Sequence, residues 1–361
     1  MHAMPSVPAL YFPALDGLRF FAFLLVFVHH LPRSSVPILA LLHDQGWVGV
    51  HIFLLLSAYL LTTILRAERA ANGKISVVKF YIRRGLRIWP LYFAFCICAL
   101  VLSIFRHSLP IDWFRFGGLI FFVDNVVTGF LGWNPIAYTA HLWTISLEEQ
   151  FYLVLPVFLA GLLGAEPKHI WRVLVACWLV FLGIRVIAVL LNAPHPMIWT
   201  SVFSADSLLL GTLLGALRPI PPKTVAVRLA LVVGGTVALF AGIFFPPIDK
   251  IGAQQVVIYS FVAGGAAALT TAALHEPLLD FLAVNPFRYL GKISYGLYVF
   301  HFVGIAIGAS LQAWIGSTSW WVLAVLALIV TIGLSVLSYE FFERRFLVMK
   351  RRFETVQSRA A

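Results

Sequence analysis

The chain has 361 residues, of which 61% are hydrophobic and 11% are charged, and its mean hydropathy is +0.93. These values exclude an ordinary soluble globular domain and indicate a polytopic protein whose solvent is the lipid bilayer. The net charge of +11 is explained by basic residues that face anionic lipid headgroups, so we expect membrane lipids and no nucleic acid as partners.

Apolar stretches long enough to cross about 30 Å of hydrocarbon recur along the whole chain. We predict an all-α integral membrane protein with about ten transmembrane helices. They cover residues 15–32, 46–65, 88–105, 143–164, 173–191, 202–217, 226–245, 255–275, 293–315 and 320–340. Polar residues and glycines interrupt the apolar segment 116–133, which predicts an interfacial or re-entrant segment rather than a span.

Basic residues orient these spans. With ten spans, both chain ends and most of the 26 Lys and Arg residues lie on the cytoplasmic side, as the positive-inside rule expects. We divide the chain into a transmembrane domain over residues 13–347 and a basic cytoplasmic tail over residues 348–361. Cys96, Cys98 and Cys177 lie inside spans without metal-ligand spacing, so we predict neither a disulfide nor a metal site.

The first span begins with the sequence LDGLR, which ends at Arg19, and it finishes with His29 and His30. A histidine in lipid loses its hydration, and chains avoid it there unless it has protein partners or a task. Because His30 follows Arg19 by close to three turns, the two side chains share one helix face and lie about 16 Å apart along the axis. We therefore take His30 as a candidate base and Arg19 as its companion at the membrane edge.

The fourth span opens with HLWTISLEEQFY. Glu148 and Tyr152 share a helix face, whereas Glu149 points about 100° away. The first and fourth spans run in opposite directions, which predicts that His30 and Glu148 occupy the same membrane layer. A carboxylate beside an imidazole fixes its tautomer and raises its basicity. We predict that Glu148 orients His30; a buried polar contact that only holds two helices together is the alternative.

The loop between the second and third spans is rich in basic residues. Topogenic charge accounts for most of them. Arg84 and Arg87 differ, because they are three residues apart at the start of a helix that runs straight into the membrane. Guanidinium groups at that spacing suit phosphates, such as those of a nucleotide-bearing cofactor at the cytoplasmic face.

Other polar residues interrupt later spans. Arg185 and Asp206 flank a short outer loop, and we prefer the interpretation that they form an ion pair over a substrate-orienting role. In the ninth span, Ser294, Tyr298 and His301 form one helix face. This face lines an acceptor or pantetheine channel, or it serves helix packing.

Seven motifs in order resemble the signatures of the membrane-bound acyltransferase-3 family, from about residue 13 to residue 347. They are LDGLR with His30, GWVGVHIFLLLSAYLLT, FYIRRGLRIWPLYF, HLWTISLEEQFY, SADSLLLG, LGKISYGLYVFH and SYEFFERRF. The resemblance implies transfer of an acyl group, commonly acetyl, from cytoplasmic acyl-CoA to a hydroxyl of a carbohydrate or other envelope-directed acceptor. It also implies a bacterial inner-membrane protein in which His30 is catalytic.

Several positions depart from the family pattern, including an SGF-like turn that reads Ser57, Ala58 and Tyr59. His51 stands where most relatives have an acidic residue, and Arg345 stands where a proline usually follows Glu-Arg. We take His51 as a polar packing residue rather than as a second base. The second change is expected to affect only the tail.

The expected mechanism is general-base catalysis. His30, oriented by Glu148, removes the proton of the acceptor hydroxyl while its oxygen attacks the thioester of acyl-CoA. The sequence leaves open whether the acyl group first rests on His30. The residues assigned to the donor are Arg19, Arg84 and Arg87, those assigned to the substrate are Tyr152, His301 and Asp206, and the oxyanion candidates are Tyr152 and Ser146.

Two alternatives to an enzyme use the same intramembrane polar residues. A proton-coupled transporter or flippase is the first, but the sequence shows no internal repeat of the kind that such proteins have. A non-catalytic membrane scaffold is the second. The combined presence of His30, Glu148, Arg84 and Arg87 favours the enzyme.

Overall fold

The computed structural model describes residues 10–106, 112–193, 205–218, 224–245, 252–275 and 277–356, and helices dominate this part of the chain. The long helices are α1 (Pro13–His30), α3 (Val48–Asn72), α4 (Val77–Arg106), α7 (Trp143–Leu162), α8 (Pro167–Leu190), α12 (Gln254–His275), α14 (Ser294–Trp314) and α15 (Trp320–Ser338). The shorter ones are α2 (Pro37–Gln45), α5 (Trp113–Ile120), α6 (Asp124–Leu131), α10 (Asp206–Leu217), α11 (Val225–Leu239), α13 (Phe287–Lys292) and α16 (Arg344–Arg351). Single turns of 3-10 or π geometry cover Ala241–Phe244, Pro277–Ala283 and Tyr339–Glu343.

Eight helices of the described residues are long and apolar enough to cross a membrane, and the last of them continues through α15 and α16. The shorter apolar helices α10 and α11 lie on the sixth and seventh predicted spans. Residues 202–204 of the sixth predicted span lie outside the described residues. The prediction of an all-α polytopic membrane protein is confirmed.

The segment predicted to be re-entrant, 116–133, is covered by α5 and α6, with a break at residues 121–123. Each of these helices has 8 residues and is therefore only about 12 Å long, too short to cross the hydrocarbon. The break is stabilised by Gln150 of α7, whose amide donates to the Phe122 carbonyl at 2.8 Å. Neither helix is long enough to span, as expected for an interfacial or re-entrant segment.

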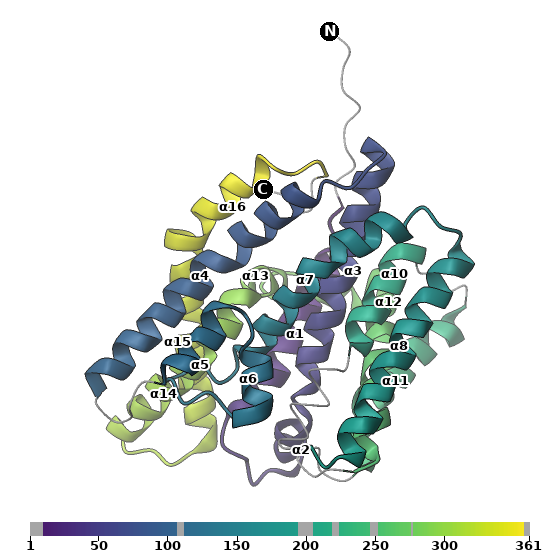
Figure 1. The fold of residues 1–361 in the computed structure, drawn as a ribbon. Helices are drawn as coiled ribbons and strands as arrows, with labels where there is room; N and C mark the ends of the chain where they lie inside the picture. Colours follow the sequence, from purple (N-terminus) through teal and green to yellow (C-terminus); the bar gives the residue numbers. More distant parts are fainter. Residues whose placement is uncertain are drawn as a thin grey trace.

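The centre of the bundle is α1, which contacts α2, α3, α12, α13 and α14 (Figure 1). Its apolar side chains Phe23 and Val26 are fully buried. Near its start the backbone of Asp16 touches Gly291 of α13, where a Cβ atom would lie 1.7 Å from the Asp16 carbonyl oxygen. Glycine is required at this close approach, so the LDGLR and LGKISYG motifs pack directly against each other.

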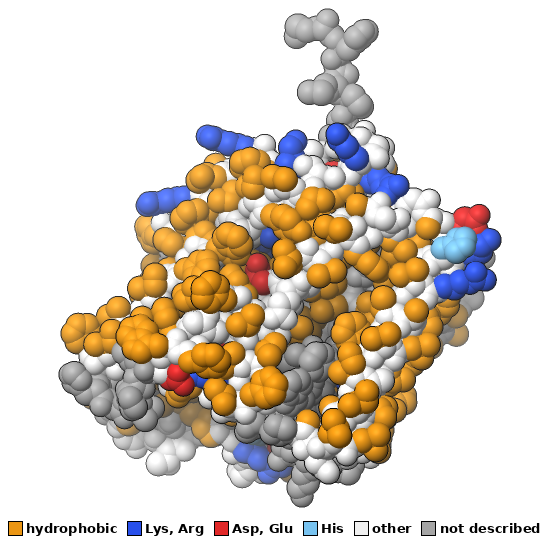
Figure 2. Space-filling model, viewed as in Figure 1, with side chains coloured by type: hydrophobic (Ala, Val, Ile, Leu, Met, Phe, Trp, Pro, Cys, Tyr) orange, Lys and Arg blue, Asp and Glu red, His pale blue; other side chains and the backbone are white. Residues whose placement is uncertain are grey.

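The two ends of the bundle differ in charge. α1 leads into α2 at the bottom of Figure 1, whereas α16 lies near the top. Lys and Arg side chains gather along the top edge of the face shown in Figure 2, and hydrophobic side chains cover much of its flank. We name these ends the α2 end and the α16 end.

The predicted boundary between residues 347 and 348 falls inside α16. The chain beyond α16 is held against α4, because Arg83 donates to the Phe353 carbonyl at 2.9 Å and Val356 is buried. Residues 357–361 of the predicted tail lie outside the described residues.

Candidate active site

Three histidines from different parts of the chain meet toward the α2 end. His30 ends α1, His301 lies in α14, and His141 stands just before α7. The ring centroids of His30 and His301 are 4.9 Å apart, and those of His141 and His301 are 4.6 Å apart. Phe302 packs against all three rings. We call His30, His141 and His301 the histidine cluster.

The hydrogen bonds of the cluster determine which ring nitrogens carry protons. His301 Nδ1 lies 2.5 Å from the Tyr298 carbonyl oxygen, which can only accept, so in a neutral ring this nitrogen carries the proton. His301 Nε2 then has a lone pair and accepts from His30 Nδ1 at 3.1 Å. This network assigns the free lone pair of His30 to Nε2. His30 is therefore held as a neutral imidazole with one basic nitrogen available.

The partner that orients His30 differs from the sequence prediction. Glu148 was expected beside His30, but the residue of that segment at the level of the histidine cluster is His141. Glu148 lies in α7, about 8 Å along the helix axis from its first residue, Trp143. The charges that act on Glu148 include those of Arg19 and Arg84. The hydrogen-bond partner of His30 in the described residues is His301, and an orienting role of Glu148 stays a prediction.

Glu148 lines a pocket with the three predicted donor-binding arginines. The space within this pocket, together with the open solvent at its mouth, is about 720 Å³. Its polar side chains are Arg19, Ser57, Arg84, Arg87, Thr144, Glu148, Tyr152, Ser294, Tyr295 and Tyr298. The structure thus brings Arg19, Arg84 and Arg87 together from α1 and α4, and we call this space the arginine pocket.

The arginines of α4 differ in their partners. Arg83 forms a buried ion pair with Glu68 at 2.9 Å, and it also binds the Phe353 carbonyl. Arg84 faces the pocket, and its buried Nε forms no hydrogen bond with any described residue. Guanidinium donors of this kind suit a phosphate ligand. Arg84 and Arg87 therefore line the pocket, whereas their neighbour Arg83 is bound by Glu68 and the Phe353 carbonyl.

Tyr298 connects the arginine pocket to the histidine cluster. Its side chain lines the pocket, and its carbonyl oxygen binds His301. Its hydroxyl donates to the His141 carbonyl at 3.0 Å and lies 2.6 Å from Thr144 Oγ1. The predicted face of Ser294, Tyr298 and His301 therefore runs from the pocket to the cluster.

The other predicted residues divide between the pocket and its surroundings. The Tyr152 hydroxyl lies in the pocket, 2.6 Å from Ser57 Oγ. Ser146 is buried and is not part of the pocket wall. Glu149 accepts a hydrogen bond from Trp89 Nε1 at 3.0 Å, so the two adjacent glutamates of α7 have different surroundings, as their helical positions predict.

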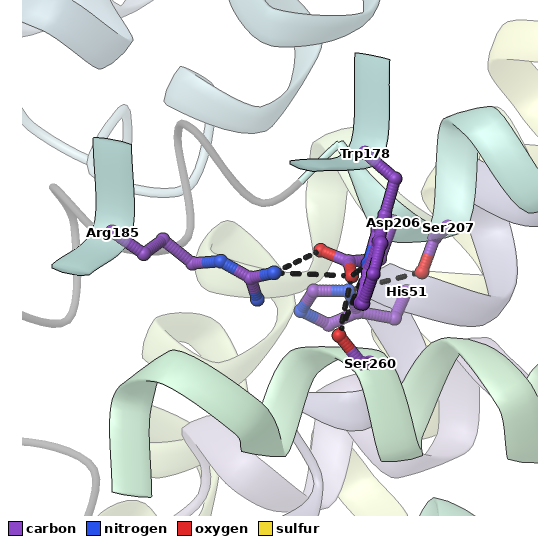
Figure 3. A network of polar contacts seen from close by, with 6 residues as sticks. All are labelled: His51, Trp178, Arg185, Asp206, Ser207 and Ser260. Carbon is purple, nitrogen blue, oxygen red and sulfur yellow. Dashed lines mark hydrogen bonds and ion pairs between the residues drawn. The ribbon is translucent and has the colours of Figure 1, made fainter. Parts of the chain in front are cut away.

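Asp206 lies in a separate polar network around the start of α10 (Figure 3). The predicted ion pair with Arg185 is present, at 3.1 Å, and both side chains are buried. Trp178 Nε1 and Ser260 Oγ each donate to Asp206 at 2.6 Å. Beside it, His51 Nδ1 lies 3.2 Å from Ser207 Oγ, as expected for polar packing. A substrate-binding role for Asp206 remains a prediction.

A family comparison covers most of the chain. The model of the acyltransferase domain matches residues 12–340, which include α1 through α15 and every residue assigned above. The chain belongs to the membrane-bound acyltransferase-3 family. The sequence resemblance is therefore confirmed over nearly all of the described helices.

Three curated relatives are 27% or 28% identical to this acyltransferase-3 chain over the aligned residues. The O-acetyltransferase OatA of Staphylococcus aureus is 28% identical over 316 residues, which is 81% of this chain and 50% of the relative. The peptidoglycan O-acetyltransferase OatA of Listeria monocytogenes is 27% identical over 92% of this chain and 55% of its own length. The putative peptidoglycan O-acetyltransferase YrhL of Bacillus subtilis is 27% identical over 92% and 54%. The chain spans about half the length of these relatives, and no solved structure matches it.

Sequence reasoning missed two features of the site. It gave no role to His141, although this residue precedes an apolar run and stands at the outer end of a predicted span, as His30 does. It also counted Lys350 as part of a free tail, whereas Lys350 is buried on α16. The first could have been found from its position, but the second depends on the docking of α16 against α4.

Proposed function

We propose that the protein is a membrane O-acyltransferase that moves an acyl group, in the first instance acetyl, from acyl-CoA to a hydroxyl of a carbohydrate such as peptidoglycan. The observation that carries this proposal is the hydrogen bond between His30 and His301. His301 lies on the same helix as Tyr298, which lines the arginine pocket. One site thus offers a base and, next to it, a space for a phosphorylated donor.

The donor would enter from the α16 end. Arg84 and Arg87 suit the diphosphate of CoA, and Arg19 lines the same pocket. Arg19 and His30 are about 16 Å apart along α1. The pantetheine arm would cover this interval along the wall formed by Tyr298, which brings the thioester toward the histidine cluster.

His30 Nε2 supports general-base catalysis. It accepts the proton of the acceptor hydroxyl as the oxygen attacks the thioester carbonyl carbon. The tetrahedral intermediate then collapses, the carbon–sulfur bond breaks, and the CoA thiolate takes the proton from His30. The products are the O-acyl ester and free CoA. His301 holds the tautomer through this cycle, in the orienting role that the sequence assigned to Glu148.

The membrane orientation follows from the same scheme. Acyl-CoA is cytoplasmic, so the basic α16 end would face the cytoplasm, in agreement with the positive-inside rule. The histidine cluster would then lie toward the outer face of a bacterial inner membrane. An acceptor destined for the envelope would meet the acyl group at that level.

The test is a transfer assay with the purified chain in lipid nanodiscs, acetyl-CoA labelled in the acetyl group, and soluble peptidoglycan fragments. We expect labelled fragments heavier by one acetyl group and an equal amount of free CoA. Release of CoA without any acylated fragment, or no consumption of acetyl-CoA, would contradict the proposed function.

A further inference from the structure

α16 brings a third cation to the arginines of α4. α16 packs along α4 (Figure 1), and its Lys350 is only 8% exposed. The positive charges of Arg84 and Arg87 both act on the Lys350 ammonium group. Lys350 therefore lies where α16 packs on α4, close enough to feel the charges of two arginines that line the arginine pocket.

Lys350 is held in a defined position. Its Nζ forms an ion pair with Glu354 Oε1 at 2.8 Å, and both side chains are largely buried. The segment that carries Glu354 is attached to α4 by the hydrogen bond from Arg83 to the Phe353 carbonyl. This ion pair is therefore part of the packed structure and not a contact made by an unattached tail.

The charges around these cations suggest a place for an anion. Like charges that lie close together with little solvent repel one another, which costs free energy. An anion between them removes this cost. Glu148 and Glu149 act on Arg84, and Glu343 acts on Arg87. Lys350 has Glu354. Glu354 differs from the other carboxylates because it lies in the short segment after α16. A ligand with more negative charge can replace its carboxylate beside Lys350.

We propose that Lys350 binds the ribose 3′-phosphate of the CoA donor and that Glu354 occupies this place while the donor is absent. This inference rests on the proposed function. CoA carries a diphosphate and, at the end farthest from the thioester, a 3′-phosphomonoester. Arg84 and Arg87 line the pocket wall and suit the diphosphate, whereas Lys350 reaches them from α16. A phosphomonoester carries more negative charge than a carboxylate and displaces it from the ammonium group.

The test measures nucleotide binding to the full chain in lipid nanodiscs by titration calorimetry. The two probes are adenosine 3′,5′-bisphosphate and adenosine 5′-monophosphate, which differ only in the 3′-phosphate. We expect the bisphosphate to bind about tenfold more tightly, the effect of one charge-assisted contact. Lys350→Met should abolish this preference, and Lys350→Arg should retain most of it. Glu354→Gln should tighten bisphosphate binding severalfold.

Lys292→Met is the matched control. Lys292 also lies toward the α16 end, but it packs over the Tyr339 ring at 5.2 Å, and this variant should keep the preference. Equal binding of the two probes to the unaltered chain would overturn the inference, and so would an equal loss of both in Lys350→Met. Because no acyl transfer is measured, these outcomes are distinct from a failure of the proposed function, which the transfer assay detects.

Discussion

His301 Nε2 lies 3.1 Å from His30 Nδ1, and the other ring nitrogen of His301 is bound to the Tyr298 carbonyl. The two imidazoles therefore form a dyad. The Tyr298 carbonyl sets the tautomer of His301, and His301 sets the tautomer of His30. A neutral histidine takes the place that a carboxylate occupies in many catalytic pairs. In the membrane interior this avoids the cost of a buried negative charge beside the base.

Replacement of His301 tests its orienting role. His301→Phe removes the acceptor for His30 Nδ1, so we expect kcat to fall by about 10- to 100-fold, the usual effect of losing a residue that orients a reactive histidine. The KM for acetyl-CoA should change little. His301→Gln offers an amide oxygen as acceptor and should recover part of kcat. A fall in donor affinity with an unchanged kcat would instead indicate a packing role.

Removal of the Arg84 guanidinium tests donor binding. Arg84→Met should raise the KM for acetyl-CoA at least tenfold, because a charge-assisted phosphate contact is lost. Arg84→Lys should restore only part of the affinity, since an ammonium group lacks the planar fork. Steady-state kinetics at several donor concentrations give the answer. An Arg84→Met enzyme with the original KM would exclude Arg84 from the donor site.

The Arg185–Asp206 pair should contribute to stability. Both side chains are buried, so Asp206→Asn leaves an uncompensated charge, at a cost of about 3–5 kcal/mol. Thermal unfolding in detergent should show a lower midpoint for Asp206→Asn, and the double variant Asp206→Asn/Arg185→Met should recover part of the loss. If Asp206→Asn unfolds at the original temperature but no longer modifies the acceptor, the substrate-binding role predicted from the sequence gains support.

The buried carboxyl of Asp124 should make the stability of the folded chain depend on pH. It lies in α6, outside the spanning helices, and burial raises the pKa of its carboxyl from 3.8 to about 6. The folded chain thus binds this proton more tightly than the unfolded chain. The resulting stabilisation is complete below pH 3.8 and is lost as the pH rises through about 6. Unfolding midpoints of Asp124→Asn should therefore change less than those of the unaltered chain between pH 3.8 and about pH 6, the window bounded by the two pKa values. Identical slopes would contradict the assignment.

The sequence predicted the helices well because span length and apolarity are local properties. It separated Arg84 and Arg87 from their basic neighbours, and it grouped Ser294, Tyr298 and His301 on one face by helical period. It could not predict the partner of His30, since that depends on the depth of α7 in the bundle. Glu148 follows His141 by seven positions, and the apolar pattern does not fix which of the two meets the cluster.

The packing of α16 against α4 could not be predicted from the sequence either. A basic segment after the last apolar run is typical of cytoplasmic charge, and nothing local shows that Lys350 turns inward. The contact depends on the buried Arg83–Glu68 pair and on the position of Phe353 next to it. These residues are far apart in the chain and are brought together only by the fold.

The most direct test of the account compares His30→Ala with His29→Ala in the acetyl-transfer assay. His29 is adjacent on α1, and its ring centroid lies 5.1 Å from that of His30, but its Nδ1 contacts the His43 carbonyl at 2.6 Å rather than a cluster nitrogen. Both variants should be inserted in the membrane and should bind adenosine 3′,5′-bisphosphate as the unaltered chain does. We predict that His30→Ala forms no acetylated fragment while His29→Ala retains most of the activity. Normal turnover by a folded His30→Ala protein would contradict the assignment of His30 as the base.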